Sequence, residues 1–180
     1  MKFLCIGLLT FAAMAQNASK RTAHVNVTDP GGRFVAGLDR DAFSIVENGV
    51  TRAITGFAAS DAPVAIAIVT AEPLYGADWK IHAGNELIET RTVAEALRQL
   101  SGSKSSRKAL VTTVDTGDVV IPSGIQAVHS SPERMFASVA QLQSQYSLSF
   151  DSNGTAANVE IVIHAPRGLP ALKSSTSLAE

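Results

Sequence analysis

The residues Val64-Ala65-Ile66-Ala67-Ile68-Val69 form an unbroken apolar run in the middle of the sequence. Such a run without a polar position is typical of a strand that is buried on both faces of a parallel sheet. Two helix signals follow it along the chain. Thr92 and Glu95 have the spacing of a capping box, and Ser131 followed by Pro132 marks a second helix start.

Strands and helices alternate after this run, which indicates an open α/β sheet. A further buried strand is predicted over residues 109–114, between the two helices. Residues 146–150 and 159–163 alternate between apolar and polar side chains, and they predict an antiparallel hairpin at a sheet edge. The apolar stripes of the two helices contain Val93, Leu97 and Leu100, and Met135, Val139 and Leu142.

The residues before the run, 21–60, predict a small all-β module. Residues 24–28 alternate, and Asn48-Gly49 separates two β-prone segments. Asn-Gly in this position predicts a hairpin, because both central residues of a type I′ turn need positive φ. The expected core of the module is formed by Phe43, Ile45, Ile54 and Phe57.

Composition excludes several classes of protein. The chain has 180 residues and a net charge of −1, without the basic surplus that non-specific nucleic-acid binding requires. Hydrophobic residues make up 46% and charged residues 17%, which is enough to build a packed core. The single cysteine, Cys5, excludes a disulfide framework and a cysteine-based zinc site.

The first residues predict a signal peptide over residues 1–15. Lys2 precedes an apolar stretch over residues 3–13, and Ala13-Met14-Ala15 offers the small residues that a signal peptidase recognises. We expect cleavage before Gln16, a secreted or periplasmic location, and no membrane span in the mature chain. At the other end, residues 166–180 are expected to form a flexible tail.

Several segments resemble bacterial proteins that carry a VWFA-related domain. The similarity is dense over residues 23–70 and patchy over residues 90–165. The segments that carry it are Val25-Asn26-Val27-Thr28-Asp29, Gly32-Arg33-Phe34-Val35, Gly37-Leu38, Phe43-Ser44-Ile45-Val46-Glu47-Asn48-Gly49, Ile54, Asp61-Ala62-Pro63-Val64, Ala94-Glu95-Ala96-Leu97, Arg107-Lys108-Ala109-Leu110 and Gln145-Tyr146-Ser147-Leu148-Ser149-Phe150. The resemblance implies an α/β fold. A small N-terminal β module over 21–60 would precede a truncated von Willebrand factor type A-like, Rossmann-like sheet over 61–165, with helices and a C-terminal antiparallel hairpin.

The metal site of that family is altered in this sequence. Type A domains hold a divalent cation with an Asp-x-Ser-x-Ser loop, because hard cations such as Mg²⁺ need converging oxygen ligands. The corresponding positions are Ala71-Glu72-Pro73-Leu74-Tyr75, in which Ala71 and Pro73 carry no side-chain oxygen. The segment up to Glu89 is also shorter than in the family, so one or more central strand–helix units are expected to be missing.

The loop Asp115-Thr116-Gly117-Asp118 resembles the third metal loop of the family. Asp115 and Asp118 are therefore the candidate residual metal ligands. The alternative is that both are turn residues after a strand, where Asp and Gly are common. We favour the turn interpretation, because one or two carboxylates without a partner loop rarely hold a hard cation. No cofactor is expected, and Mg²⁺ is the candidate if a metal binds.

These features together predict an exported, non-catalytic, adhesion-like protein-interaction module that works without a metal. No catalytic motif of the serine-hydrolase, phosphate-loop or His-Glu-x-x-His type is present, so no enzyme activity is expected. Partner-binding residues are expected beyond the apolar run, because ligands of open α/β sheets bind outside the carboxyl ends of strands. These residues are Glu72, Tyr75 and Trp79.

Two alternatives remain open at this point. One is divalent-metal-dependent binding through a rebuilt site; its candidate ligands are Glu72, Asp78, Asp115 and Asp118. The other is a decayed remnant without a ligand. The partner in the favoured hypothesis is an unknown protein, and self-association is a further expectation because missing central units would expose strand edges.

Overall fold

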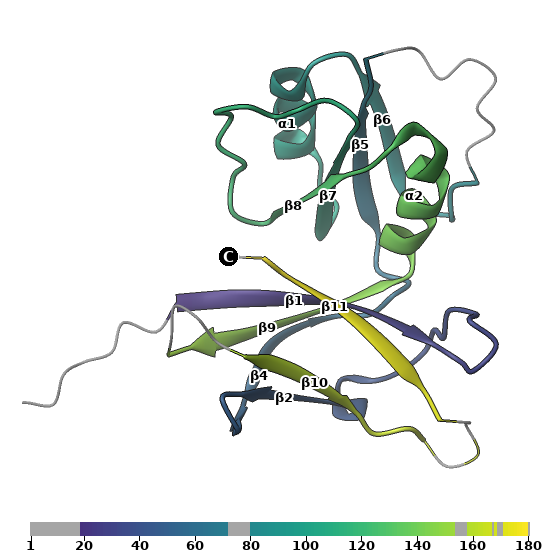
Figure 1. The fold of residues 1–180 in the computed structure, drawn as a ribbon, viewed down its shortest axis with the longest axis vertical. Coiled ribbons are helices and arrows are strands. Elements are labelled where there is room, and N and C mark those ends of the chain that lie inside the picture. The colour runs from purple at the N-terminus through teal and green to yellow at the C-terminus, as the bar shows by residue number, and fades with distance from the viewer. Residues whose placement is uncertain (1–18, 72–79, 154–157, 167, 169–170, 180) are drawn as a thin grey trace, which may run out of the picture.

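The computed structural model describes residues 19–71, 80–153, 158–166, 168 and 171–179. Within these residues, a four-stranded and a three-stranded antiparallel sheet enclose one core and form a β-sandwich. A parallel four-stranded sheet with one helix on each face lies beside the sandwich (Figure 1).

The sandwich combines strands from both ends of the chain. In order of pairing, its larger sheet contains β11 (Lys173–Ala179), β1 (Ser19–Thr28), β9 (Gln145–Ser152) and β4 (Ile54–Ala58). Its smaller sheet contains β10 (Val159–Ile163), β2 (Phe43–Glu47) and β3 (Val50–Arg52), and the short helix η1 (Arg40–Ala42) precedes β2.

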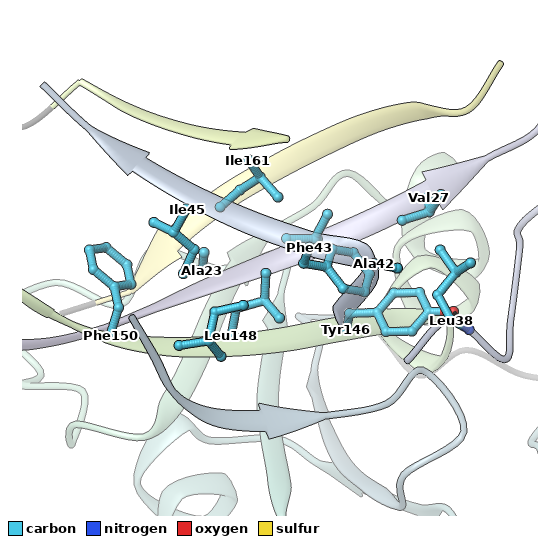
Figure 2. Close-up of a cluster of buried hydrophobic side chains, with 12 residues drawn as sticks. Ala23, Val27, Leu38, Ala42, Phe43, Ile45, Tyr146, Leu148, Phe150 and Ile161 are labelled. Atoms are coloured by element: carbon cyan, nitrogen blue, oxygen red, sulfur yellow. Dashed lines mark hydrogen bonds between the residues drawn. The ribbon is translucent and has the colours of Figure 1, made fainter. Parts of the chain in front are cut away.

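Alternate side chains of β1 and β9 fill the sandwich core. The ring of Tyr146 lies 5.0 Å from that of Phe43, measured between centroids, and Figure 2 shows Tyr146 between Phe43 and Leu38 in the buried cluster. The Tyr146 hydroxyl accepts a hydrogen bond from the Leu38 N–H at 3.1 Å and donates one to the Val35 carbonyl at 2.9 Å. The buried tyrosine is therefore satisfied, and it ties the loop before η1 to the core.

The predicted Asn-Gly hairpin is confirmed. Asn48 and Gly49 have φ angles of +51° and +80°, and they join β2 to β3 as an antiparallel pair. The predicted core of this module is also confirmed, because Phe43, Ile45 and Ile54 are buried and Phe57 packs against them.

The parallel sheet has the strand order β6-β5-β7-β8. Its strands are β6 (Glu86–Thr90), β5 (Val64–Val69), β7 (Arg107–Thr112) and β8 (Ile125–His129). The apolar run over residues 64–69 forms β5, and all six of its residues are buried between the two helix layers. Helix α1 (Val93–Gly102) covers one face and α2 (Met135–Gln143) covers the other.

The two helices begin near the predicted residues. The Thr92 side chain accepts a hydrogen bond from the Glu95 N–H at 3.3 Å, as expected of an N-cap. Ser131 makes no such cap; Pro132 instead opens a short 3₁₀ turn, η2 (Pro132–Arg134), that leads into α2. In the described part of the chain, no helix has the length and apolar character that crossing a bilayer requires.

The expected α/β class, with a truncated von Willebrand factor type A-like, Rossmann-like sheet with helices, is wrong. The described residues are mostly β, with 45% in strands and 17% in helices, and they contain two α-helices. Antiparallel and parallel sheets occur together. The prediction gave too much weight to the helix–strand alternation after residue 60, and it missed that the sandwich draws three strands from that same part of the chain.

Two local expectations near the C-terminus are also corrected. The strands β9 and β10 do not pair as a hairpin, because β9 pairs with β1 and β4 in one sheet while β10 pairs with β2 in the other. Residues 173–179 of the expected flexible tail form strand β11 along β1. An alternating pattern predicts the faces of a strand but not its partner, which can lie far away in sequence.

Candidate functional site

The loop after β7 holds the two aspartates that the sequence singled out. Asp115 and Asp118 are both exposed, and Oδ1 of Asp115 accepts a hydrogen bond from the Gly117 N–H at 3.0 Å. Gly117 has a φ of +55°, so Asp115 caps a tight turn. In the part of the chain that the structure describes, no three His, Cys, Asp or Glu side chains gather as a metal site would require.

The other predicted site residues lie outside the described residues. Glu72, Tyr75, Asp78 and Trp79 all fall within 72–79. The expected partner-binding residues and the rebuilt metal site therefore stay predictions.

A cavity of about 310 Å³ lies between the outer face of the larger sandwich sheet and the start of strands β7 and β8. His24 of β1 lines it, with Nδ1 at 3.0 Å from Oγ of Ser147. Burial, and then the nearby charge of Arg107, lowers the pKa of His24 to about 4. A catalytic base beside a hydroxyl needs a group that orients it. Among the described residues, His24 hydrogen-bonds Ser147 and no carboxylate, so we interpret the pair as structural.

Arg107 is a buried cation between the two parts of the fold. Its guanidinium donates to the Gln145 carbonyl at 2.6 Å, to Leu142 at 3.2 Å, and to Ser60 at 3.3 Å, and Nε donates to Ala62 at 3.0 Å. A further bond from the second terminal nitrogen reaches the same Ala62 carbonyl. An arginine has five N–H donors, and these five bonds use them all.

The carbonyls that Arg107 binds belong to the two places where the chain passes between the sandwich and the parallel sheet. Ser60 and Ala62 lie in the link from β4 to β5, whereas Leu142 lies at the end of α2 and Gln145 at the start of β9. Burial lowers the pKa of the Arg107 guanidinium, and Asp61 partly opposes this effect. Arg107 thus hydrogen-bonds the backbone at both places and has no N–H donor left for a ligand.

The open edge of the parallel sheet lies along β8. Among the described residues, β8 pairs with β7 on one side and with no strand on the other (Figure 1). The Ser130 N–H donates to the Thr112 carbonyl of β7 at 2.9 Å. Because backbone groups of successive residues face opposite edges, Val128 also faces β7, whereas Ala127 and His129 direct their N–H and C=O groups outward. Both side chains are exposed.

A groove of about 430 Å³ runs beside this edge, between β8, α2 and the end of β11. None of its lining residues is charged; they are Ile121, Pro122, Ile125, Gln126, Ala127, Val128, Ser138, Gln141, Leu142, Gln145, Ser177 and Leu178. Nε2 of Gln126 donates a hydrogen bond to Oγ of Ser177 at 3.3 Å, which links β8 to β11, two of the elements that line the groove. We refer to β8 and these lining residues as the β8 groove.

Exposed apolar side chains occur in the segments that precede and follow β8 in the sequence. In the loop before the strand, Val119 is 42% and Val120 is 84% exposed, and Phe136 in the first turn of α2 is 48% exposed. Apolar exposure beside an unpaired strand is typical of a protein interaction surface.

Strand β8 and the groove were not among the features predicted from the sequence. A signal was present, because Ile125 and Val128 lie in a short segment between Gly124 and the helix start at Ser131. The segment has five residues and adjacent apolar side chains at Ala127 and Val128, so its pattern does not distinguish a strand from a helix or a loop.

Comparisons with family models, with curated proteins and with solved structures gave no match. The resemblance to VWFA-related proteins therefore stays a prediction.

Proposed function

We propose that this chain is an exported, non-catalytic protein-interaction module that binds its partner without a metal. The observation that carries the proposal is the open edge of β8 beside an uncharged groove. Outward N–H and C=O groups at such an edge accept an extended segment as one more strand. The backbone bonds supply affinity, and the groove supplies selectivity through the side chains that it accommodates.

The lining of the β8 groove favours an uncharged partner segment. No lysine, arginine, aspartate or glutamate lines it, so a charged side chain that entered would lose its hydration without gaining a counter-ion. Small polar and apolar side chains at alternate positions would fit both the groove and the exposed valines before β8.

A peptide selection tests this function. We expect random heptapeptides displayed on phage to yield uncharged, β-prone binders of the purified chain. Ala127→Pro removes one outward N–H, and we expect it to weaken the selected peptides about tenfold or more. Ala127→Ser is the matched control, because it keeps the N–H and should bind normally. Equal affinity for both variants, with equal melting temperatures, would place the binding site elsewhere.

Metal independence is tested separately by calorimetry. Titration of Mg²⁺, Ca²⁺ or Mn²⁺ into the purified chain is expected to give no saturable heat, and chelators should leave peptide binding unchanged. A saturable heat that disappears in Asp115→Ala would establish the metal-dependent alternative through Asp115 instead.

Export is supported by the charged, apolar and small-residue order of residues 1–15. Expression in a bacterial host followed by N-terminal mass analysis of the exported protein is expected to find Gln16 first. An intact Met1 on a protein that stays in the cytoplasm would overturn this part of the proposal.

A further inference from the structure

We infer that the segment bound at β8 is β8 of a second copy of this chain, so that two parallel sheets join edge to edge about a two-fold axis. The inference rests on the proposed function, because it names the partner of the same edge. It follows from a comparison of the described strand edges and from the symmetry of β8 itself.

The described edge strands differ in how they discourage pairing. Charged residues, bulges and irregular pairing at an edge all oppose the addition of another strand. Each of the other edges has one of these features: Glu86 and Glu89 on β6, Lys173 on β11, Glu160 on β10, Arg52 on β3 and a register shift between Ile54 and Gly56 on β4. Strand β8 has none of them, and it is the edge with an uncharged groove beside it.

The residues of β8 suit antiparallel pairing with themselves. A two-fold axis through Ala127 places Ala127 of one copy opposite Ala127 of the other, and Ile125 opposite His129. The Ala127 pair exchanges both of its outward backbone bonds. The His129 N–H can donate to the Ile125 carbonyl of the other copy, whereas the Ile125 N–H already donates to Pro122 at 3.2 Å. The interface therefore gains about four backbone hydrogen bonds.

The side chains at the axis allow this close approach. Ala127 is small and exposed, so two copies meet there without a clash or a buried charge. Antiparallel pairing brings the start of one β8, preceded by Val119 and Val120, beside the end of the other, followed by α2 with Phe136. The same pair of segments therefore meets at each end of the interface, as in an isologous contact.

Substitutions of Ala127 by residues of opposite charge test the inference. The mass of the purified chain is measured by light scattering over a range of concentrations, and we expect twice the chain mass at the upper end. Ala127→Lys and Ala127→Glu each place two like charges face to face, and we expect each variant to be a monomer. An equimolar mixture of the two is expected to regain the dimer mass. The control is Thr51→Lys on the β3 edge, which should remain a dimer.

The outcomes separate this inference from the proposed function. A dimer that neither Ala127 variant dissociates would overturn the inference, as would two monomeric variants that fail to pair when mixed. The chain could instead be a monomer at all concentrations and bind selected peptides with an affinity that Ala127→Pro lowers. That result would overturn the inference that a second copy is the partner, but it would support the proposed function. A monomer without such peptide binding would overturn both.

Discussion

His24 is a polar residue that lies between the sandwich and the parallel sheet. The outer face of the larger sandwich sheet is polar, and His24 and Ser147 share a hydrogen bond there beside a cavity. The imidazole lies close enough to Arg107 for the positive charge to oppose its protonation. His24 is therefore a neutral structural residue at neutral pH, and its titration should affect stability.

Stability is predicted to fall as the pH is lowered from 6.5 towards 4. The unfolded chain takes up the His24 proton near pH 6.5, whereas the folded protein takes it up only near pH 4. Between these values the unfolded state binds more protons, so the free energy of unfolding decreases with decreasing pH. At pH 4.5 the loss is on the order of 2 kcal/mol. Urea unfolding at a series of pH values measures it.

The His24→Gln variant separates this effect from the titration of carboxylates. Glutamine can still hydrogen-bond Ser147 but does not titrate, so the variant should lose less stability than the wild type over the same range. Identical slopes for the two proteins between pH 6.5 and 4.5 would show that His24 is not the group responsible.

At the scale of secondary-structure elements, the β2–β3 hairpin depends on Gly49. Its φ of +80° is costly for a residue with a Cβ, although no atom lies within 4 Å of the place where a Cβ would be. Gly49→Ala is therefore predicted to destabilise the chain by about 1 kcal/mol through the backbone alone.

The matched control is Gly102→Ala at the end of α1. Its Cβ position is equally open, but its φ is not positive. That substitution is expected to be neutral or stabilising, because alanine favours the helix. Thermal unfolding of both variants checks the pair, and equal losses at the two positions would contradict the turn argument.

Local elements could be predicted from the sequence because their signals are local. The Asn48-Gly49 turn, the Thr92 cap and the buried strand β5 each depend on a few adjacent residues. The pairing of β1 with β11 could not be predicted in this way. Residues 173–179 are mostly serine and threonine, and they form a strand because β1 supplies a hydrogen-bonded edge from the other end of the chain.

The candidate site was predictable to a smaller extent. The interpretation of Asp115 as a turn residue needed only the Asp-Gly pattern, and its carboxylate does bond the Gly117 N–H. The β8 groove joins residues of α2, β8 and β11. No short motif marks such a site, because it exists only after these elements have been brought together.

At the scale of the whole molecule, Arg107 holds the sandwich and the parallel sheet together. The chain passes between them through residues 59–63 and at the junction of α2 with β9, and the Arg107 guanidinium binds carbonyls at both places. A buried group with this many bonds leaves several acceptors unsatisfied when it is removed.

Arg107→Met is accordingly predicted to cost about 3–5 kcal/mol of unfolding free energy, because the carbonyls stay buried without donors. Arg107→Lys should lose less, since an ammonium can still reach some of them. Lys108→Met is the control; its Nζ makes a single contact of 3.4 Å, to Ser101, and we expect a change within about 0.5 kcal/mol. Urea unfolding of the three variants measures these differences. An Arg107→Met variant as stable as Lys108→Met would refute the role of Arg107 in joining the two parts of the fold.

The measurement that tests the central claim most directly is residue-resolved amide exchange at Ala127 and His129. A selected peptide is titrated into the chain at a concentration where the chain is monomeric. An added strand along β8 predicts that exchange slows about tenfold or more at these two amides as the peptide saturates. Saturated binding with unchanged exchange at both amides would contradict the assignment of β8 as the interaction edge.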